Sequence, residues 1–315
     1  MSLHEGAETA VHQCLGLSAG ETCVVVTDDE RRDIAEALYE AAADVTDDAV
    51  VVRYPPGEQH GEEPPDPVAA AMRSADAFLA PTTKSLSHTR ARSRATEDGV
   101  RGATLPGITE EVFTTGLDAD YDEIAAHCAT LLERVRDADE IRVTAPNGTD
   151  VTVRPGDRRW REDTGLVADP GAFSNLPAGE VFVSPETADG TYVVDGTMMP
   201  YGRLADDQTL RFEVEAGRVT EIGDDEIRSQ VETAAESVGD AAYNLAELGI
   251  GTNVAVRDLV GSVLLDEKAA GTVHLAIGDD AGIGGDVSAP LHLDGIITNP
   301  TVYADGVPVS LPGRT

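Results

Sequence analysis

Residues 21–54, ETCVVVTDDERRDIAEALYEAAADVTDDAVVVRY, decide the fold of the first part of the chain. Residues 21–27 and 49–54 are short apolar runs of the kind that form buried strands. Between them, residues 31–43 carry apolar side chains at helical spacing, on one face of a helix. The order strand, helix, strand predicts a parallel pair of strands joined by a crossover helix.

The same alternation continues to about residue 107. We predict further strands at residues 77–80 and 102–105. We also predict a helix that begins with residues 67–72 and another helix at residues 90–95. Strands that alternate with helices predict an α/β domain built on a doubly wound parallel sheet. In such sheets, ligands bind beyond the carboxyl ends of the strands.

The pattern changes after a long amphipathic helix predicted at residues 121–137. Two short strands flank an Asn147-Gly148 turn, which is typical of a β-hairpin. More short strands follow, with one helix at about residues 225–239. We therefore expect two domains, residues 1–138 and residues 139–315, of which the second is α+β and largely antiparallel.

Acidic residues dominate the composition, with 58 Asp and Glu against 23 Lys and Arg and a net charge of −35. They are spread along the chain and do not form a tail, which favours a solvated acidic surface of the kind found in extreme halophiles. Lysine occurs only at Lys84 and Lys268, and no basic patch is present to bind nucleic acid. The three cysteines are irregularly spaced, and no apolar run reaches transmembrane length, so we expect a cytoplasmic protein without membrane contact.

The candidate chemistry lies in the last third of the chain. His292 and Asp294 are two residues apart in an apolar context, so in a strand they point to the same face. His274 lies in a second apolar, strand-like run, although a lone buried histidine is more often a structural one. Imidazole and carboxylate together are typical ligands of Zn, Co, Mn or Fe(II).

Two glutamates extend this candidate set. Glu180 follows a Pro-Ala-Gly turn at the first position of an apolar strand, and Glu247 lies at what reads as the end of a helix. Either carboxylate could equally be a solvated surface group.

Several segments, taken in order, resemble the metal-binding segments of the aminopeptidase T family of metallopeptidases. They are residues 175–185, 246–248, 266–278 and 292–294, together with an N-terminal run at residues 85–92 that leads to residues 105–107. The resemblance implies a two-domain homodimer that releases N-terminal residues from small peptides by means of metal-activated water. It implies one or two divalent ions (Zn, Co or Mn) on five ligands: Glu180, Glu247, His274, His292 and Asp294.

The resemblance also suggests Glu267 as a general base. A structural carboxylate paired with Lys268 or Arg257 is the alternative for this residue. The family pattern has a tyrosine ligand seven residues after the histidine of the third segment, where this chain has Ala281.

The missing tyrosine leaves two other interpretations open. The chain is also similar to ring-cleaving dihydroxypyridine dioxygenases, which implies a single Fe(II) held by His274, His292 and Asp294. His88 would then be a base contributed by the N-terminal domain. Few aromatic residues are available to contact a ring, namely Trp160, Phe173 and Tyr192. The third interpretation is a family member that binds a metal or ligand without catalysis.

Overall fold

The computed structural model of the chain describes residues 1–313, which divide into two compact units. The first unit comprises residues 1–125 and a returning segment, Asp163–Ala178. The second comprises residues 126–162 and the chain from Gly179 onward. The division falls inside helix α6 (Tyr121–Val135), upstream of the boundary predicted at residue 138.

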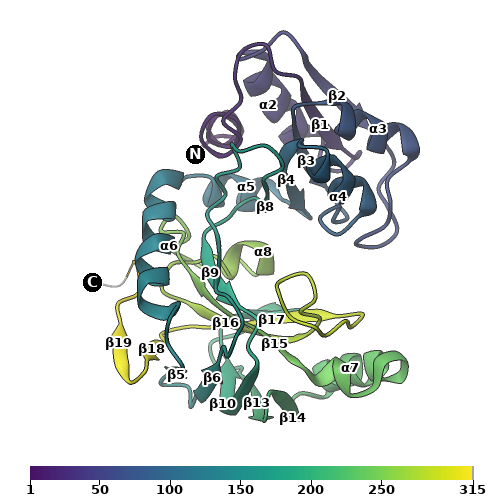
Figure 1. Cartoon of the computed structure of the whole chain (residues 1–315). Coiled ribbons are helices and arrows are strands. Elements are labelled where there is room, and N and C mark those ends of the chain that lie inside the picture. The colour runs from purple at the N-terminus through teal and green to yellow at the C-terminus, as the bar shows by residue number, and fades with distance from the viewer. Residues whose placement is uncertain (314–315) are drawn as a thin grey trace. The chain divides into compact units, whose positions relative to one another are not determined.

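The first unit is built on a parallel five-stranded sheet with the order β2-β1-β3-β4-β8 (Figure 1). Strand β1 is buried throughout, and its valines suit a central strand that is covered on both faces. The fold class predicted from the alternation of strands and helices is confirmed. The last strand, β8, comes from the returning segment, which the sequence pattern did not single out.

The elements of the first unit follow the predicted order, with additional helices near its start and end. They are α1 (Leu3–Glu8), the π-helical segment η1 (Thr9–Cys14), β1 (Cys23–Thr27), α2 (Arg32–Ala43), β2 (Ala49–Arg53), α3 (Asp66–Ser74), β3 (Ala77–Thr82), α4 (Arg90–Glu97), β4 (Arg101–Pro106), α5 (Glu110–Gly116) and β8 (Phe173–Asn175).

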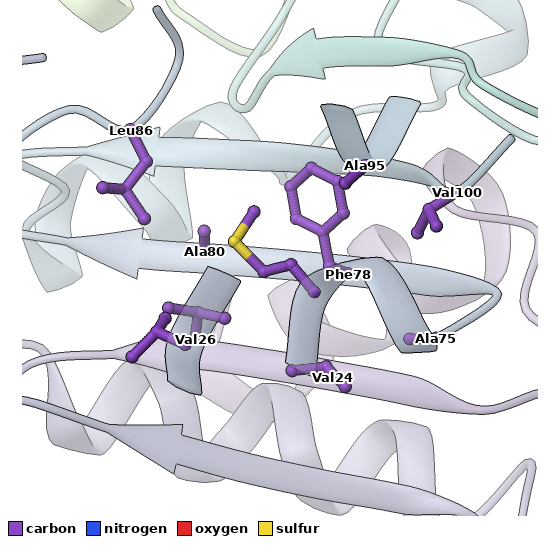
Figure 2. Packing of buried hydrophobic residues seen from close by; sticks show 10 residues of the cluster. Val24, Val26, Ala75, Phe78, Ala80, Leu86, Ala95 and Val100 are labelled. Carbon is purple, nitrogen blue, oxygen red and sulfur yellow. The ribbon is translucent and has the colours of Figure 1, made fainter. Parts of the chain in front are cut away.

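Phe78 is the largest side chain of the core cluster on the α3 and α4 side of this sheet. Figure 2 shows its ring pointing from β3 toward Ala95 of α4, with Val24 and Val26 on the neighbouring strand. Gly102 of β4 lies beside the ring, and a Cβ at this position would be 2.5 Å from Phe78 Cδ1. The core therefore depends on one aromatic ring surrounded by small and β-branched residues.

The second unit consists of two sheets whose strands are paired mainly antiparallel. One sheet has the order β14-β13-β10-β6-β5-β18-β19, and the other has the order β12-β11-β17-β16-β15-β9-β7. Strands β10 and β17 are in contact, and a Cβ at Gly295 of β17 would overlap Val194 of β10. The two sheets thus pack face to face, which leaves the other face of the second sheet available for polar side chains.

The strands and helices of the second unit have the following bounds. They are β5 (Ile141–Thr144), β6 (Asp150–Arg154), β7 (Arg161–Asp163), β9 (Glu180–Val183), β10 (Thr187–Val194), β11 (Thr197–Met198), β12 (Gly202–Arg203), β13 (Leu210–Glu215), β14 (Arg218–Ile222), α7 (Asp225–Val238), the 3-10 helix η2 (Gly239–Tyr243), β15 (Leu245–Gly251), α8 (Val263–Asp266), β16 (Val273–Gly278), β17 (His292–Ile297), β18 (Thr301–Ala304) and β19 (Val307–Val309).

Within residues 1–313, no helix is both long enough and apolar enough to cross a membrane. Cys14, Cys23 and Cys128 are all buried and form no disulfide, as the sequence pattern indicated.

We expect Phe78→Ala to lower the free energy of unfolding by about 3–5 kcal/mol, because the ring is fully buried and its loss leaves a cavity. Val50→Ala on β2 is the control: its side chain is 46% exposed, and the change should stay within about 0.5 kcal/mol. Urea titration followed by circular dichroism measures both. Equal destabilisation by the two substitutions would contradict this account of the core.

Candidate metal centre

The five predicted ligands lie on one face of the second sheet of unit 2. Strands β9, β15, β16 and β17 are neighbours in this sheet. Residues that face each other across paired strands point to the same side, as do residues two apart along a strand. Gly251 pairs with Glu180, Ala276 pairs with both Glu247 and Asp294, and Gly278 pairs with His292.

The register also places His274 on this face, opposite Gly249. Glu247 therefore lies inside strand β15, and its assignment to a helix end was wrong. The intervening residues of the face are small, since Gly249, Gly251, Ala276 and Gly278 separate the ligands. A Cβ at Gly249 would overlap the imidazole of His274, so the glycine is what allows the ring to lie on the sheet.

Glu247 links the two imidazoles. Its Oε1 lies 3.4 Å from His274 Nε2, and its Oε2 lies 3.3 Å from His292 Nε2. The same nitrogen of His292 is 3.2 Å from Asp294 Oδ1, and His274 Nε2 is 3.4 Å from Glu180 Oε2. The two oxygens of the Glu247 carboxylate thus contact one imidazole each, and Glu247 lies at the centre of a continuous cluster.

Three overlapping groups in this cluster have ligand atoms within 4.8 Å of one another. The first comprises Glu180, Glu247 and His274. The second comprises Glu247, His292 and Asp294, and the third comprises Glu267, His274 and Asp294. Among the described residues, none of these groups contains both histidines, so the structure does not place His274, His292 and Asp294 in one such group.

The contacts of His292 fix which of its nitrogens faces the cluster. Its Nδ1 lies 2.7 Å from the main-chain oxygen of Asp279, which can only accept a hydrogen bond. Nδ1 therefore carries the proton in the neutral ring, and Nε2 presents its lone pair to Glu247 and Asp294.

The donor set fits a divalent metal ion. Glu180 Oε2 is buried and has no hydrogen-bond partner, a costly condition that a nearby cation relieves. The surrounding donors are carboxylate oxygens and imidazole nitrogens, which suit Zn, Mn, Co or Fe(II).

The cluster shifts the pKa values of Glu247 and of the two imidazoles in opposite directions. Burial alone would raise the pKa of Glu247, but hydrogen bonds to His274 and His292 bring it below its usual range. Burial would likewise lower the pKa of His274, yet the hydrogen bond to Glu247 and the nearby carboxylates raise it to about 9. The pKa of His292 is raised in the same way, mainly by the charge of Asp294.

Glu267 and Lys268 form a further part of the centre. Lys268 Nζ lies 2.8 Å from Glu267 Oε1 and also pairs with Glu180 Oε1. The ion pair with Lys268 is the structural alternative that the sequence left open for Glu267. Lys268 was not among the predicted site residues, although a lysine in a chain with only two lysines was a usable signal.

The loop of residues 279–291 joins β16 to β17 and includes Ala281, the position where the aminopeptidase T pattern has tyrosine. Ala281 is exposed. The neighbouring Asp280 is buried and accepts hydrogen bonds from Ser184 Oγ, Asn244 Nδ2 and the backbone of Val287. The loop is thus anchored by one internal carboxylate.

The remaining predicted site residues are not on strands β9, β15, β16 or β17. His88 is exposed and directly precedes Thr89, the N-cap of α4 in the first unit. Tyr192 is fully buried and stacks on Phe212 at 4.6 Å, and the guanidinium of Arg92 lies 4.4 Å from the Phe173 ring centre. Trp160 is buried as well.

The chain has an aminopeptidase T-like fold, and one face of its second unit carries groups of side chains that could hold a metal ion. A family model described as 2,5-dihydroxypyridine 5,6-dioxygenase (NicX) matches residues 5–315. This match spans nearly the whole chain, and the chain belongs to that family. No curated protein matches it.

Several solved structures share the fold, including the following two. The 2,5-dihydroxypyridine dioxygenase from Pseudomonas putida KT2440 has a TM-score of 0.78 at 20% identity, over 98% of this chain and 96% of that chain. Wild-type AmpT from Thermus thermophilus has a TM-score of 0.69, also at 20% identity, over 99% of this chain and 98% of that chain. The predicted aminopeptidase T-type fold is therefore confirmed.

The expectation of a hydrolase, a metallo-aminopeptidase, is wrong. The family model is that of a dioxygenase, which is an oxidoreductase, and the 2,5-dihydroxypyridine dioxygenase structure matches with a higher TM-score than the AmpT structure. Dioxygenase and aminopeptidase share this fold, so the order of the metal-facing segments did not separate the two activities.

We expect Gly249→Ala to weaken metal binding at least about tenfold, because the added methyl group displaces the His274 ring from the sheet. Ala276→Gly, on the same face of the adjacent strand, adds no bulk and should leave the affinity nearly unchanged. Calorimetric titration with Mn(II) gives both affinities. Wild-type affinity in Gly249→Ala would show that the ring position is unimportant for binding.

We also expect the metal-free protein to lose thermal stability between about pH 6.5 and 9. The pKa of His274 in the folded chain is raised to about 9, so the protonated ring stabilises the fold. This contribution is complete below the ordinary value of about 6.5 and is lost as the pH rises through the raised pKa.

Melting curves of the metal-free protein against pH measure this slope. Bound metal replaces the protons and should flatten the curve, and His274→Asn should reduce the slope in the metal-free protein. A metal-free protein whose stability is constant over this range would rule out the raised pKa.

Proposed function

We propose that the chain is an Fe(II)-dependent dioxygenase that cleaves a dihydroxylated nitrogen heteroaromatic ring of the 2,5-dihydroxypyridine class. The family match over residues 5–315 is the observation that carries this proposal. The cluster of imidazoles and carboxylates around Glu247 supports it, because this donor set suits Fe(II).

In this proposal, the ion is held by residues drawn from the cluster around Glu247, His292 and Asp294. Bound Fe(II) would supply the redox chemistry that oxygen and an electron-rich ring require. His292 is oriented by its hydrogen bond to the Asp279 carbonyl, so its Nε2 lone pair is directed into the cluster without rearrangement. The side chains of His292 and Asp294 are 31% and 12% exposed, which leaves this end of the cluster accessible.

The chain also offers candidates for proton transfer. A ring hydroxyl must lose its proton to bind a metal ion strongly, and an imidazole or a buried carboxylate can accept that proton. His88 remains our proposed base, and the exposure of its side chain suits contact with a ligand.

We expect protein loaded with Fe(II) under anaerobic conditions to consume oxygen when 2,5-dihydroxypyridine is added. Asp294→Asn should lower the rate at least about a hundredfold, because it removes a charged donor from the cluster. His88→Asn tests the proposed base in the same assay. His4→Asn, an exposed histidine near the N-terminus, is the control and should retain the full rate.

An oxygen electrode and the loss of the ring absorbance report the reaction independently. A fully iron-loaded protein that leaves this ring and its close analogues intact would contradict the proposal.

A further inference from the structure

The first unit contains a group of polar side chains that the proposed reaction does not use. Ser85 and Ser87 lie in the loop that follows β3, Thr104 lies in β4, and Asn175 is the last residue of β8. Ser87 Oγ and Thr104 Oγ1 are 2.7 Å apart, and both hydroxyls donate to Asn175 Oδ1, at 2.8 Å and 2.6 Å respectively. Ser85 Oγ donates to Ser87 Oγ at 3.0 Å. We call these four side chains the hydroxyl cluster.

The hydroxyl cluster lies at the edge of the parallel sheet where ligands are expected. The loop after β3 and the last residues of β4 and β8 are at the carboxyl ends of parallel strands, and Thr104 pairs with Asn175 in the register. Ser87 and Thr104 are 2% and 0% exposed. Buried polar groups are more costly than the apolar groups that could fill the same space, so their presence requires a reason.

The cluster and its neighbours together fix the loop that carries His88. The carbonyl oxygen of Ser87 accepts a hydrogen bond of 2.7 Å from Arg92 Nε. Thr89 Oγ1 donates to the carbonyl oxygen of Leu86 at 2.8 Å, and Leu86 itself packs into the core cluster of Figure 2. The backbone on both sides of His88 is therefore held in place.

His88 is the side chain that this fixed loop presents to its surroundings. Leu86, Ser87 and Thr89 are buried and Ser85 is half-buried, whereas His88 is exposed. A base must lie within hydrogen-bond reach of the proton it removes, and a displacement of about 1 Å can lower the rate about a hundredfold. A loop that is locked by buried hydrogen bonds meets this requirement for an exposed imidazole.

We infer that the hydroxyl cluster positions His88 for proton transfer, and that Ser87, Thr104 and Asn175 are positioning residues that act through the loop. This inference rests on the proposed function, in which His88 is the base. It also gives the returning segment, Asp163–Ala178, a role. That segment carries Asn175 back to the first unit, where its amide joins β4 to the loop.

Matched substitutions at Thr104 test this role, because valine has nearly the shape of threonine without the hydroxyl. We expect Thr104→Val to lower kcat for the cleavage of 2,5-dihydroxypyridine at least about tenfold with little change in KM, because the base is misplaced. Thr104→Ser, which keeps the hydroxyl, should stay within about threefold of the wild-type rate. Circular dichroism shows whether both variants fold.

Combination with His88→Asn separates positioning from a role in folding. If the cluster acts through His88, Thr104→Val should lower the rate no further in the His88→Asn background. Equal factors of loss in the two backgrounds would overturn the inference. A wild-type rate in folded Thr104→Val, or in His88→Asn, would overturn it as well.

A second measurement requires neither iron nor oxygen. The chain has seven histidines, so NMR relaxation of ¹³C-labelled imidazole rings can follow each one, and His88→Asn identifies the signal of His88. We expect an ordered His88 ring in the wild type and in Thr104→Ser, and a mobile one in Thr104→Val. The exposed ring of His4 is the mobile reference. A wild-type His88 ring as mobile as that of His4 would refute the inference, even if Thr104→Val does not fold.

The two readouts distinguish this inference from the proposed function. An ordered His88 ring that Thr104→Val releases, in a protein that leaves the substrate intact, would contradict only the proposed function. Ring cleavage by a protein whose His88 is mobile would contradict only the positioning role.

Discussion

The register between β15 and β16 is the constraint on which the candidate centre depends. It aligns Gly249 with His274 and Ala276 with Glu247, and thereby places both ligand-bearing positions on the same face. A shift of one residue in either strand would turn its polar side chains into the packed interior between the sheets. The apolar residues that alternate with the ligands hold this register, because they must remain buried against the other sheet. The hydrophobic core thus specifies the position of the polar cluster.

Much of the fold could be predicted from local patterns. The alternating strands and helices of the first unit and the Asn147-Gly148 hairpin follow from short-range periodicity and turn chemistry, and the structure has them. Glu247 was misassigned because its neighbours, Leu245, Ala246 and Leu248, are good helix formers. Pairing of β15 with strands on both sides overrides that preference. Strand β8 has three residues, too few to show any period.

The centre was only partly predictable, for a different physical reason. His292 and Asp294 are two residues apart, so a strand brings them together without help from the rest of the chain. Glu180, Glu247 and His274 join them only through pairing between distant strands, and their association was inferred from a resemblance. The contact of Lys268 with Glu180 spans 88 positions and has no local signature. Geometry and donor chemistry also leave the reaction undetermined, since an oxidoreductase and a peptidase share this fold.

The hydrogen bond from His292 to the main-chain oxygen of Asp279 has a consequence for which mutations the loop between β16 and β17 tolerates. The group that orients the imidazole is part of the backbone, so no side chain has to supply it, while Asp279 Oδ1 separately accepts a hydrogen bond from the backbone of Ala289 in the same loop. Surface residues of this loop are free to become more acidic without disturbing the ring. Insertions and deletions are different, because they would move the carbonyl itself. We therefore expect lineages of this chain to vary in the composition of the loop while conserving its length.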